Sequence, residues 1–360
     1  VEVIEDKREL PDLMSRFGVI DVPTGLDGFS GRHRAYVKVQ DGCLLRCSYC
    51  IIPHVRPKLS SRPLEHITAE VQRLVDSGHR EVVLTGIHLG HYGVDWNRNQ
   101  PRERWVRLAH LLRELCGLPG DFRIRLSSIE ATEVTRELIS VMAENPRRIV
   151  PHLHLCLQSG SDSVLRRMRR RWGTKMFLDR CRLVREALDE PAITTDVIVG
   201  FPGETEDEFE QTLTTCRRAG FSKIHAFPFS PRRGTPAAEM SDQVAKSLRS
   251  ERVGRLGELE NDLRQGYFES LVGRRLQLLV ESSRPLINIR RGHDSPGESV
   301  LHRGTTCRYA PAELNLDAGN GSSTASTESP VETGQLTNVL VVDSDSERLF
   351  VRSVNDSFIP

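Results

Sequence analysis

Long hydrophobic runs are missing from this 360-residue chain, and no apolar stretch approaches the ~20 residues of a membrane-spanning helix. An excess of one charge is missing too, because 50 Lys and Arg stand against 49 Asp and Glu. RNA binding would therefore have to come from local basic patches. Aromatic residues make up only 6%, yet hydrophobic residues reach 38%, enough for a sizeable core. The composition predicts a soluble protein of two domains, or one large α/β barrel with a small appendage.

Cysteine is sparse outside one short segment. Cys43, Cys47 and Cys50 lie within eight residues, in the spacing C-x3-C-x2-C, directly after the alternating, strand-like residues 34–40. The other five cysteines lack ligand spacing and are predicted to be buried structural thiols: Cys116, Cys156, Cys181, Cys216 and Cys307. This pattern is no disulfide framework and is typical of a protein in the reducing cytoplasm.

The three clustered thiols allow two kinds of site. Three thiolates on a four-iron cluster leave one iron open, where an external molecule can bind and react. Alternatively, His54 can complete a zinc site of three cysteines and one histidine, which would make the chain a zinc-stabilised RNA-binding protein. The cysteines alone leave both interpretations open.

Short apolar segments alternate with helical ones between residues 35 and 265. Strands are predicted at 34–40, 81–85, 122–126, 152–157, 193–199 and 223–229, and helices at 64–77, 108–116, 133–144, 162–188 with a break at Gly173, 206–219 and 240–265. Such strands form a parallel sheet with right-handed crossovers. Six units are too few to close an eight-fold barrel, so we predict an α/β fold with a partial barrel. The cysteine loop then lies at the carboxyl ends of the strands.

The pattern changes after residue 266, where strand-like segments at 274–281, 336–342 and 348–354 predict a small all-β unit. Residues 317–333 between them are small, polar and low in complexity, which predicts a disordered insert. The expected organisation is therefore an N-terminal remnant with a linker at 1–33, a partial barrel at 34–266 and a β unit at 267–360.

Residues 34–265 resemble the radical S-adenosylmethionine (SAM) domain of methylthiotransferases. The motifs that carry the resemblance stand in order at 49–53 (YCIIP), 61–63 (SRP), 84–90 (LTGIHLG), 123–130 (RIRLSSIE), 157–162 (LQSGSD), 195–204 (TDVIVGFPGE), 227–231 (FPFSP) and 234–236 (GTP). Within the family, residues 85–93 favour the subfamily that acts on tRNA N6-threonylcarbamoyladenosine. The alternatives are subfamilies that act on isopentenyladenosine in tRNA or on a ribosomal protein. The C-terminal β unit resembles a TRAM domain, a small RNA-binding barrel.

The resemblance implies two cofactors, a [4Fe–4S] cluster and SAM. Cys43, Cys47 and Cys50 would bind three irons, and the SAM amine and carboxylate would chelate the fourth. One electron from the cluster would then cleave SAM to a 5′-deoxyadenosyl radical. The expected partners are a tRNA anticodon stem-loop, where a methylthio group is added at C2 of the modified adenosine 3′ of the anticodon, and a flavodoxin or ferredoxin type of electron donor.

The family also carries three further cysteines in an N-terminal domain, which hold a second cluster that delivers sulfur. Residues 1–33, which begin at Val1, resemble only the tail of that domain. The chain is therefore expected to hold a single cluster, and to cleave SAM without methylthiolating tRNA on its own.

Candidate SAM contacts lie near predicted strand ends. Tyr49 can pack on adenine or belong to the core. At Thr85 and Gly86, a close backbone approach would bring carbonyl groups to the SAM ammonium. Ser128 follows the third strand, and Gln158 ends the fourth.

Asp196 stands inside an apolar strand, where a carboxylate needs a ligand or a buried partner, and we favour a ligand. Ser127 and Glu130 are further candidates, whereas Thr132 and Glu133 are expected to cap the next helix. A single histidine in a loop, such as His88, is more often structural than catalytic.

One short segment is strongly basic. Its residues Arg166, Arg167, Arg169, Arg170 and Arg171 are followed by Trp172. A solvated helical face is the ordinary interpretation, but this density also favours phosphate contact and base stacking. We interpret the set as an RNA-binding patch that 232–233 and 274–275 can extend.

Overall fold

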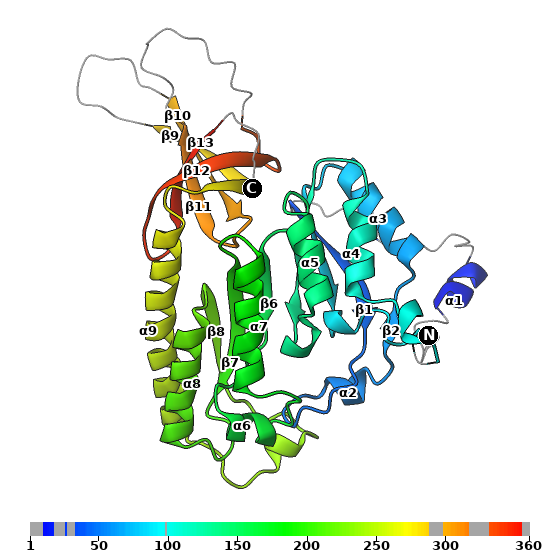
Figure 1. Ribbon diagram of the computed structural model, residues 1–360, viewed down its shortest axis with the longest axis vertical. Coiled ribbons are helices and arrows are strands. Elements are labelled where there is room, and N and C mark those ends of the chain that lie inside the picture. Colours follow the sequence, from blue (N-terminus) through cyan, green and yellow to red (C-terminus); the bar gives the residue numbers. More distant parts are fainter. Residues whose placement is uncertain are drawn as a thin grey trace.

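The computed structural model describes residues 10–17, 26, 33–97, 99–287, 298–316 and 331–354. A short helix α1 (Leu10–Arg16) is followed by a curled α/β layer and then by a closed β-barrel (Figure 1). The predicted insert at 317–333 lies outside the described residues up to position 330, as does most of segment 1–33.

The α/β layer contains two four-stranded sheets in the orders β2-β1-β3-β4 and β5-β6-β7-β8. The strands are β1 (Arg34–Asp41), β2 (Ser60–Ser61), β3 (Glu81–Gly86), β4 (Arg123–Leu126), β5 (Ser128–Ile129), β6 (His152–Leu155), β7 (Ala192–Val199) and β8 (Lys223–Pro228). All neighbouring pairs are parallel except β1 with β2. Only Ser127 separates β4 from β5, so the curled layer follows six successive parallel strand segments and confirms the partial barrel.

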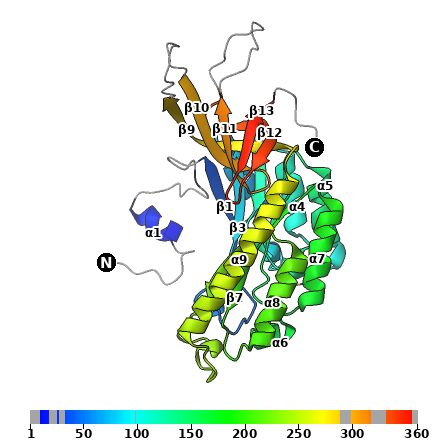
Figure 2. The same cartoon turned by 90° about the vertical axis from the view of Figure 1, so that its left-hand side faces the viewer.

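Helices cover one side of these strands. Figure 2 shows α4, α5, α7 and α8 together beside β1, β3 and β7. The helices are α2 (Ile52–Val55), α3 (Leu64–Asp76), α4 (Leu108–Cys116), α5 (Arg136–Glu144), α6 (Asp162–Arg167), α7 (Thr174–Ala187), α8 (Glu206–Ala219) and α9 (Lys246–Ser270), with 3₁₀ turns η2 (Leu89–His91), η3 (Arg102–Arg104), η4 (Ala131–Glu133) and η5 (Pro236–Ala238). The apolar faces of strands and helices form one continuous core.

The predicted break at Gly173 is confirmed, because α7 begins directly after it, but the break is wider than predicted: α6 already ends at Arg167 and Arg169 takes a left-handed conformation (φ 59°). Two other predicted helix boundaries are wrong. The helix expected from residue 133 begins at Arg136, because the Thr135 side chain is the cap that accepts a hydrogen bond from Leu138 N at 3.1 Å. Glu133 instead lies in η4 and its side chain is available for other contacts.

The last helix also differs from its predicted span of 240–265. α9 begins at Lys246 and continues to Ser270. Phe268 and Leu271 at its end pack into the core of the β-barrel, so a tertiary contact extends the helix beyond the range that its own sequence indicated.

The C-terminal unit is all-β, as predicted, and is a closed barrel in the order β10-β11-β13-β12-β9. Its strands are β9 (Arg275–Ile287), β10 (Glu298–Thr306), β11 (Pro311–Leu316), β12 (Leu336–Ser344) and β13 (Leu349–Ser353). Of these, β10 and β11 were not predicted.

The β-barrel lies at the amino ends of the parallel strands, whereas α2 and α6 lie at the opposite end (Figure 1). Arg123 at the start of β4 donates to the carbonyls of Gln277 (2.8 Å) and Thr305 (2.9 Å) in the barrel. Arg125 donates to the carbonyl of Thr306 at 3.1 Å. These contacts leave the carboxyl ends of the strands, with the cysteine loop, free of the barrel.

Candidate functional site

The cysteine loop begins after β1 with a turn that is held by hydrogen bonds of Gln40 and requires a glycine at position 42. Buried Gln40 donates to the carbonyls of Asp41 (2.7 Å) and Gly42 (2.8 Å), and its carbonyl oxygen accepts from the His88 backbone N–H at 2.8 Å. Gly42 has a φ of +80°, and a Cβ there would lie 2.0 Å from the Lys58 carbonyl oxygen. Gln40 thus ties the start of the cysteine loop to the segment that follows β3.

Ser48 anchors the middle of the loop. Its backbone N–H donates to the Met168 carbonyl (3.1 Å), its hydroxyl donates to the Arg167 carbonyl (2.7 Å), and its own carbonyl accepts from Ala237 N–H (2.8 Å). Ser48 is fully buried. These bonds hold the loop against the end of α6 and against η5, so the thiols are carried by a fixed segment.

The three thiols have different neighbours. Cys43 Sγ lies 3.7 Å from His88 Nδ1 and accepts from Leu45 N–H at 3.4 Å, whereas Cys47 Sγ accepts from an Arg170 guanidinium N–H at 3.4 Å. Burial raises the pKa of Cys43 and of Cys50. Ligation by a metal overcomes such a penalty, because it deprotonates a thiol outright.

The three thiols are not gathered as the ligands of one zinc ion would be. Ligands of one tetrahedral zinc with Zn–S bonds of about 2.3 Å would lie about 3.8 Å apart. Within the described part of the chain, two groups of three potential ligands have their atoms within 4.8 Å of one another, and the three cysteines are not among them. His54, the proposed fourth zinc ligand, is exposed on α2. The structure therefore does not bring the three thiols and His54 together as a zinc site.

Arg170 joins this loop to the strand ends and was missed as a site residue. Its side chain is 3% exposed and makes an ion pair with Glu130, which also accepts from the Trp172 indole N–H at 3.1 Å. The guanidinium lies over the Trp172 ring and 3.4 Å from the Tyr49 hydroxyl. Glu130 was a candidate from sequence; its pairing with Arg170 was not foreseen. A fixed positive charge therefore lies beside the thiols.

Tyr49 and Gly86 each have a packing role in the structure. Tyr49 packs against the small core cluster that includes Phe201 and Phe229, and burial raises its pKa. A Cβ at Gly86 would lie 3.0 Å from the Gln40 side chain, so the close approach there is to Gln40. The Thr85 hydroxyl donates to the Val37 carbonyl at 3.4 Å. Both Thr85 and Gly86 remain partly exposed at the end of β3.

Ser128 and Asp196 converge on Cys156. The ligand atoms of Cys156, His154 and Asp196 lie within 4.8 Å of one another, and His154 Nε2 is 3.3 Å from an Asp196 carboxylate oxygen. Burial raises the pKa of Cys156 to about 12, the charge of Asp196 adds to this, and a hydrogen bond with Ser128 opposes it. The Asp196 side chain is 31% exposed, so its carboxylate remains accessible beside His154.

Gln158 stands in a strained conformation, with a φ of +66°. Its N–H donates to the Asp196 carbonyl and its carbonyl accepts from Ile198 N–H, both at 2.8 Å. A non-glycine residue held in the left-handed region costs of order 1–3 kcal/mol, and such residues cluster at functional sites. These hydrogen bonds to the backbone of β7 hold Gln158 in this conformation, three residues beyond the end of β6.

The predicted RNA-binding patch is only partly correct as a surface. Arg170 and Trp172 are turned inward, and Arg167 is paired with Glu208 at 2.7 Å. These three residues therefore do not form an open phosphate-binding face. Arg166, Arg169 and Arg171 are exposed. Arg232 and Arg233 are exposed as well, whereas Arg274 is paired with Asp189 at 2.8 Å.

Four of the five dispersed cysteines are buried, as predicted: Cys156, Cys181, Cys216 and Cys307. Cys116 is only partly buried. In the described residues, no helix is both long and apolar enough to cross a membrane.

A partial parallel barrel with a three-cysteine loop after its first strand defines a class of α/β proteins built to hold a cluster at the strand ends. The sequence model of the radical SAM superfamily matches residues 37–216. The chain therefore belongs to the radical SAM superfamily, a family that implies a [4Fe–4S] cluster and SAM.

Two curated relatives refine this picture. The chain is 44% identical over 265 residues to the threonylcarbamoyladenosine tRNA methylthiotransferase MtaB of Bacillus subtilis (strain 168), covering 73% of this chain and 56% of that protein. It is 40% identical over 288 residues to the tRNA-2-methylthio-N(6)-dimethylallyladenosine synthase 1 of Mycobacterium marinum, covering 78% and 52%. The chain thus spans about half the length of the curated relatives it matches.

Among solved structures, the radical S-adenosylmethionine methyltransferase TsrM from Kitasatospora setae matches with a TM-score of 0.47 and 15% identity, over 57% of this chain and 38% of that one.

Proposed function

We propose that this chain is a radical SAM tRNA methylthiotransferase that acts on N6-threonylcarbamoyladenosine 3′ of the anticodon. The observation that carries the proposal is the fixed loop of Cys43, Cys47 and Cys50 at the carboxyl end of β1. The 44% identity to a threonylcarbamoyladenosine tRNA methylthiotransferase supports the reaction type. The added group would be a methylthio group at C2 of the adenine.

In this proposal Cys43, Cys47 and Cys50 hold the cluster, which when bound and reduced supplies the electron that cleaves the SAM sulfonium. Arg170 donates to the Cys47 sulfur and stabilises its negative charge. Glu130 in turn holds Arg170 in place.

SAM would lie across the carboxyl ends of the strands. We propose contacts from Tyr49, Thr85, Gly86, Ser128, Gln158 and Asp196. The convergence of Ser128 and Asp196 on Cys156, and the imposed conformation of Gln158, support a built surface at this edge.

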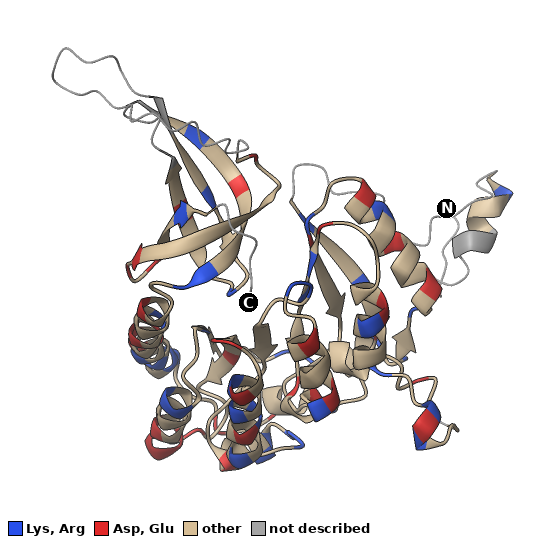
Figure 3. Ribbon diagram, turned by 45° about the horizontal axis from the view of Figure 1, so that its top comes forward, with Lys and Arg blue, Asp and Glu red and all other residues tan. Residues whose placement is uncertain are grey.

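The anticodon stem-loop of tRNA is the proposed macromolecular substrate. Arg166, Arg169 and Arg171 are exposed near the cysteine loop and would contact phosphates. Elsewhere on the helices, Lys and Arg are interspersed with Asp and Glu (Figure 3), so the contact would be local. The β unit from residue 267 onward is proposed as a TRAM-like RNA-binding unit. A flavodoxin or ferredoxin type of protein would supply electrons.

A second substrate is also supported, because the dimethylallyladenosine enzyme of Mycobacterium marinum is 40% identical. The motif at 85–93 favours threonylcarbamoyladenosine, and a ribosomal protein substrate has no such relative behind it. The two substrates are distinguished by measuring the affinity of the chain for anticodon stem-loops that carry one modification or the other. Tighter binding of the threonylcarbamoyl form supports the proposal, and a preference for the dimethylallyl form would reassign the substrate.

The dispersed cysteines set a limit on the activity of the chain. Cys156, Cys181, Cys216 and Cys307 are buried, and their spacing in the sequence is not that of cluster ligands, which supports a single cluster in this proposal. The reconstituted chain is expected to release 5′-deoxyadenosine from SAM and to leave tRNA without methylthio groups. Nucleoside analysis of tRNA after incubation checks this, and robust methylthiolation would overturn it.

A further inference from the structure

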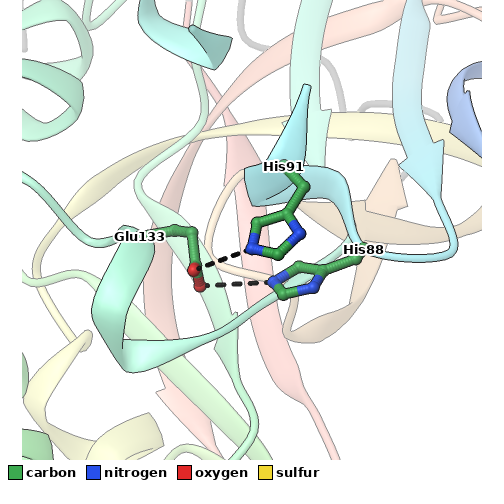
Figure 4. A group of neighbouring side chains, drawn as sticks. All are labelled: His88, His91 and Glu133. Atoms are coloured by element: carbon green, nitrogen blue, oxygen red, sulfur yellow. Dashed lines mark ion pairs between the residues drawn. The ribbon is translucent and has the colours of Figure 1, made fainter. Parts of the chain in front are cut away.

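Two histidines and one glutamate meet beside the cysteine loop and have no role in the proposed reaction. His88 and His91 come from the segment after β3, and Glu133 comes from η4 (Figure 4). Their ligand atoms lie within 4.8 Å of one another. From this geometry we propose a second metal site, in which His88, His91 and Glu133 bind one divalent transition-metal ion of the zinc type.

The distances between these side chains are those of metal ligands. His88 Nε2 lies 3.4 Å from one Glu133 oxygen, and His91 Nε2 lies 3.6 Å from the other. A good N–H···O hydrogen bond spans about 2.7–3.2 Å, so both separations are too long. Two ligands of a tetrahedral ion with bonds of about 2.0–2.2 Å lie about 3.4 Å apart. One ion placed among the three side chains would lie within reach of all three once the imidazole rings turn toward it.

Burial leaves polar atoms of this group without hydrogen-bond partners. The His88 side chain is 4% exposed, and its Nε2 and one Glu133 oxygen are buried without a hydrogen-bond partner. Buried polar atoms without partners cost free energy. A cation would satisfy both of them at once.

The surrounding chain is shaped to bring the ligands together. A Cβ at Gly90 would lie 2.3 Å from Glu133 Cγ, so a glycine there allows the carboxylate to approach the two rings. The Thr132 hydroxyl donates to the other carboxylate oxygen at 2.7 Å, and Gln40 fixes the His88 backbone. Such outer hydrogen bonds orient metal ligands. The two rings stack 3.6 Å apart at 20°, and rotation about the soft χ2 torsion would turn both nitrogens to one ion.

The site is tested apart from the cluster by zinc binding to the full chain carrying Cys43→Ala, Cys47→Ala and Cys50→Ala. We expect one tightly bound Zn²⁺ per chain. Adding His91→Ala or Glu133→Gln should weaken binding by more than the ~10–100-fold that loss of an outer partner costs. His54→Ala is the matched control, because this exposed histidine next to the cysteine loop belongs to no such group, and it should leave binding unchanged.

X-ray absorption at the zinc edge provides a measurement that does not depend on the folding of a variant. In the cluster-loaded parent chain we expect zinc with only nitrogen and oxygen neighbours, including imidazole. Absence of stoichiometric zinc, a sulfur neighbour, or binding that survives both substitutions would overturn the proposal. None of these outcomes bears on SAM cleavage, so the site stands or falls independently of the proposed function.

Discussion

Arg170 illustrates what a single residue contributes at this site. It belongs to a basic run that the sequence indicated as an RNA-binding patch, yet its guanidinium is buried beside Cys47 and paired with Glu130. The reason is the left-handed conformation of Arg169, which ends the helical spacing and turns the next side chain inward. Sequence periodicity assumes a continuous helix, so it could not distinguish Arg170 from its exposed neighbours.

We predict that Arg170→Gln impairs cluster retention and SAM cleavage. Removing one partner of a buried ion pair costs about 3–5 kcal/mol and leaves the Glu130 carboxylate unpaired near the thiolates. Iron per chain after reconstitution and the rate of 5′-deoxyadenosine release measure the effect, and we expect at least a tenfold loss of rate. Arg169→Gln is the control, because that side chain is exposed. Equal behaviour of the two variants would remove Arg170 from the site.

At the scale of elements, the sequence predicted the strands and helices of the partial barrel well, because each is a short apolar or amphipathic run between clear stops. It failed where a tertiary contact decided a boundary, as at the end of α9, where Phe268 packs into the β-barrel. The loop after β6 shows the same limit. Gly160 there lies against α8, a contact that no local pattern indicates.

Gly160→Ala should disturb the proposed SAM-binding edge. Its Cβ would lie 2.5 Å from Thr212 Cα, which is backbone and cannot move easily, so overpacking of about 1–3 kcal/mol is expected. The shift would carry Gln158 with it and weaken SAM binding. Urea unfolding and calorimetric SAM titration measure the two effects.

Gly257→Ala in α9 is the matched control for Gly160→Ala. Nothing lies within 4 Å of a Cβ at Gly257, so this change should be neutral or stabilise the helix by up to about 1 kcal/mol. If Gly160→Ala also leaves stability and SAM affinity unchanged, the contact of Gly160 with α8 does not fix the loop after β6.

At the scale of the whole molecule, a buried cluster of charged side chains joins the α/β layer to the β-barrel. Glu81 at the start of β3 pairs with Arg34 (2.9 Å), Arg123 (2.6 Å) and Arg125 (2.9 Å), and both Arg123 and Arg125 also bond the β-barrel. Sequence reasoning predicted the two units but not their docking, because contacts between residues near 81, 123 and 305 leave no periodic signal.

Glu81 should make stability depend on pH. Burial alone would raise the pKa of Glu81, but Arg125 and Arg123 hold it well below the usual range. The unfolded chain therefore binds a proton at higher pH than the folded chain, so this stabilisation is present above the ordinary carboxylate range and is lost as pH falls below it. We expect unfolding free energy to fall more steeply below about pH 4.5 in the parent than in Glu81→Gln.

At pH 7, Glu81→Gln should cost about 3–5 kcal/mol, because it leaves buried guanidinium groups without their counter-charge. The exposed pair of Glu137 and Arg113 provides the control, and Glu137→Gln should change stability by less than about 1 kcal/mol. Chemical denaturation followed by circular dichroism compares them. A Glu81→Gln chain as stable as the control would show that the ion cluster does not hold the β-barrel in place.

The most direct test of the account is metal analysis of the chain purified without oxygen and reconstituted with iron and sulfide. We predict a brown protein with about four irons per chain, as one [4Fe–4S] cluster requires, and loss of this iron when Cys43, Cys47 and Cys50 are replaced by Ala. Any zinc should persist in that variant. A colourless protein whose zinc disappears with the three cysteines would contradict the assignment of the loop to an iron–sulfur cluster.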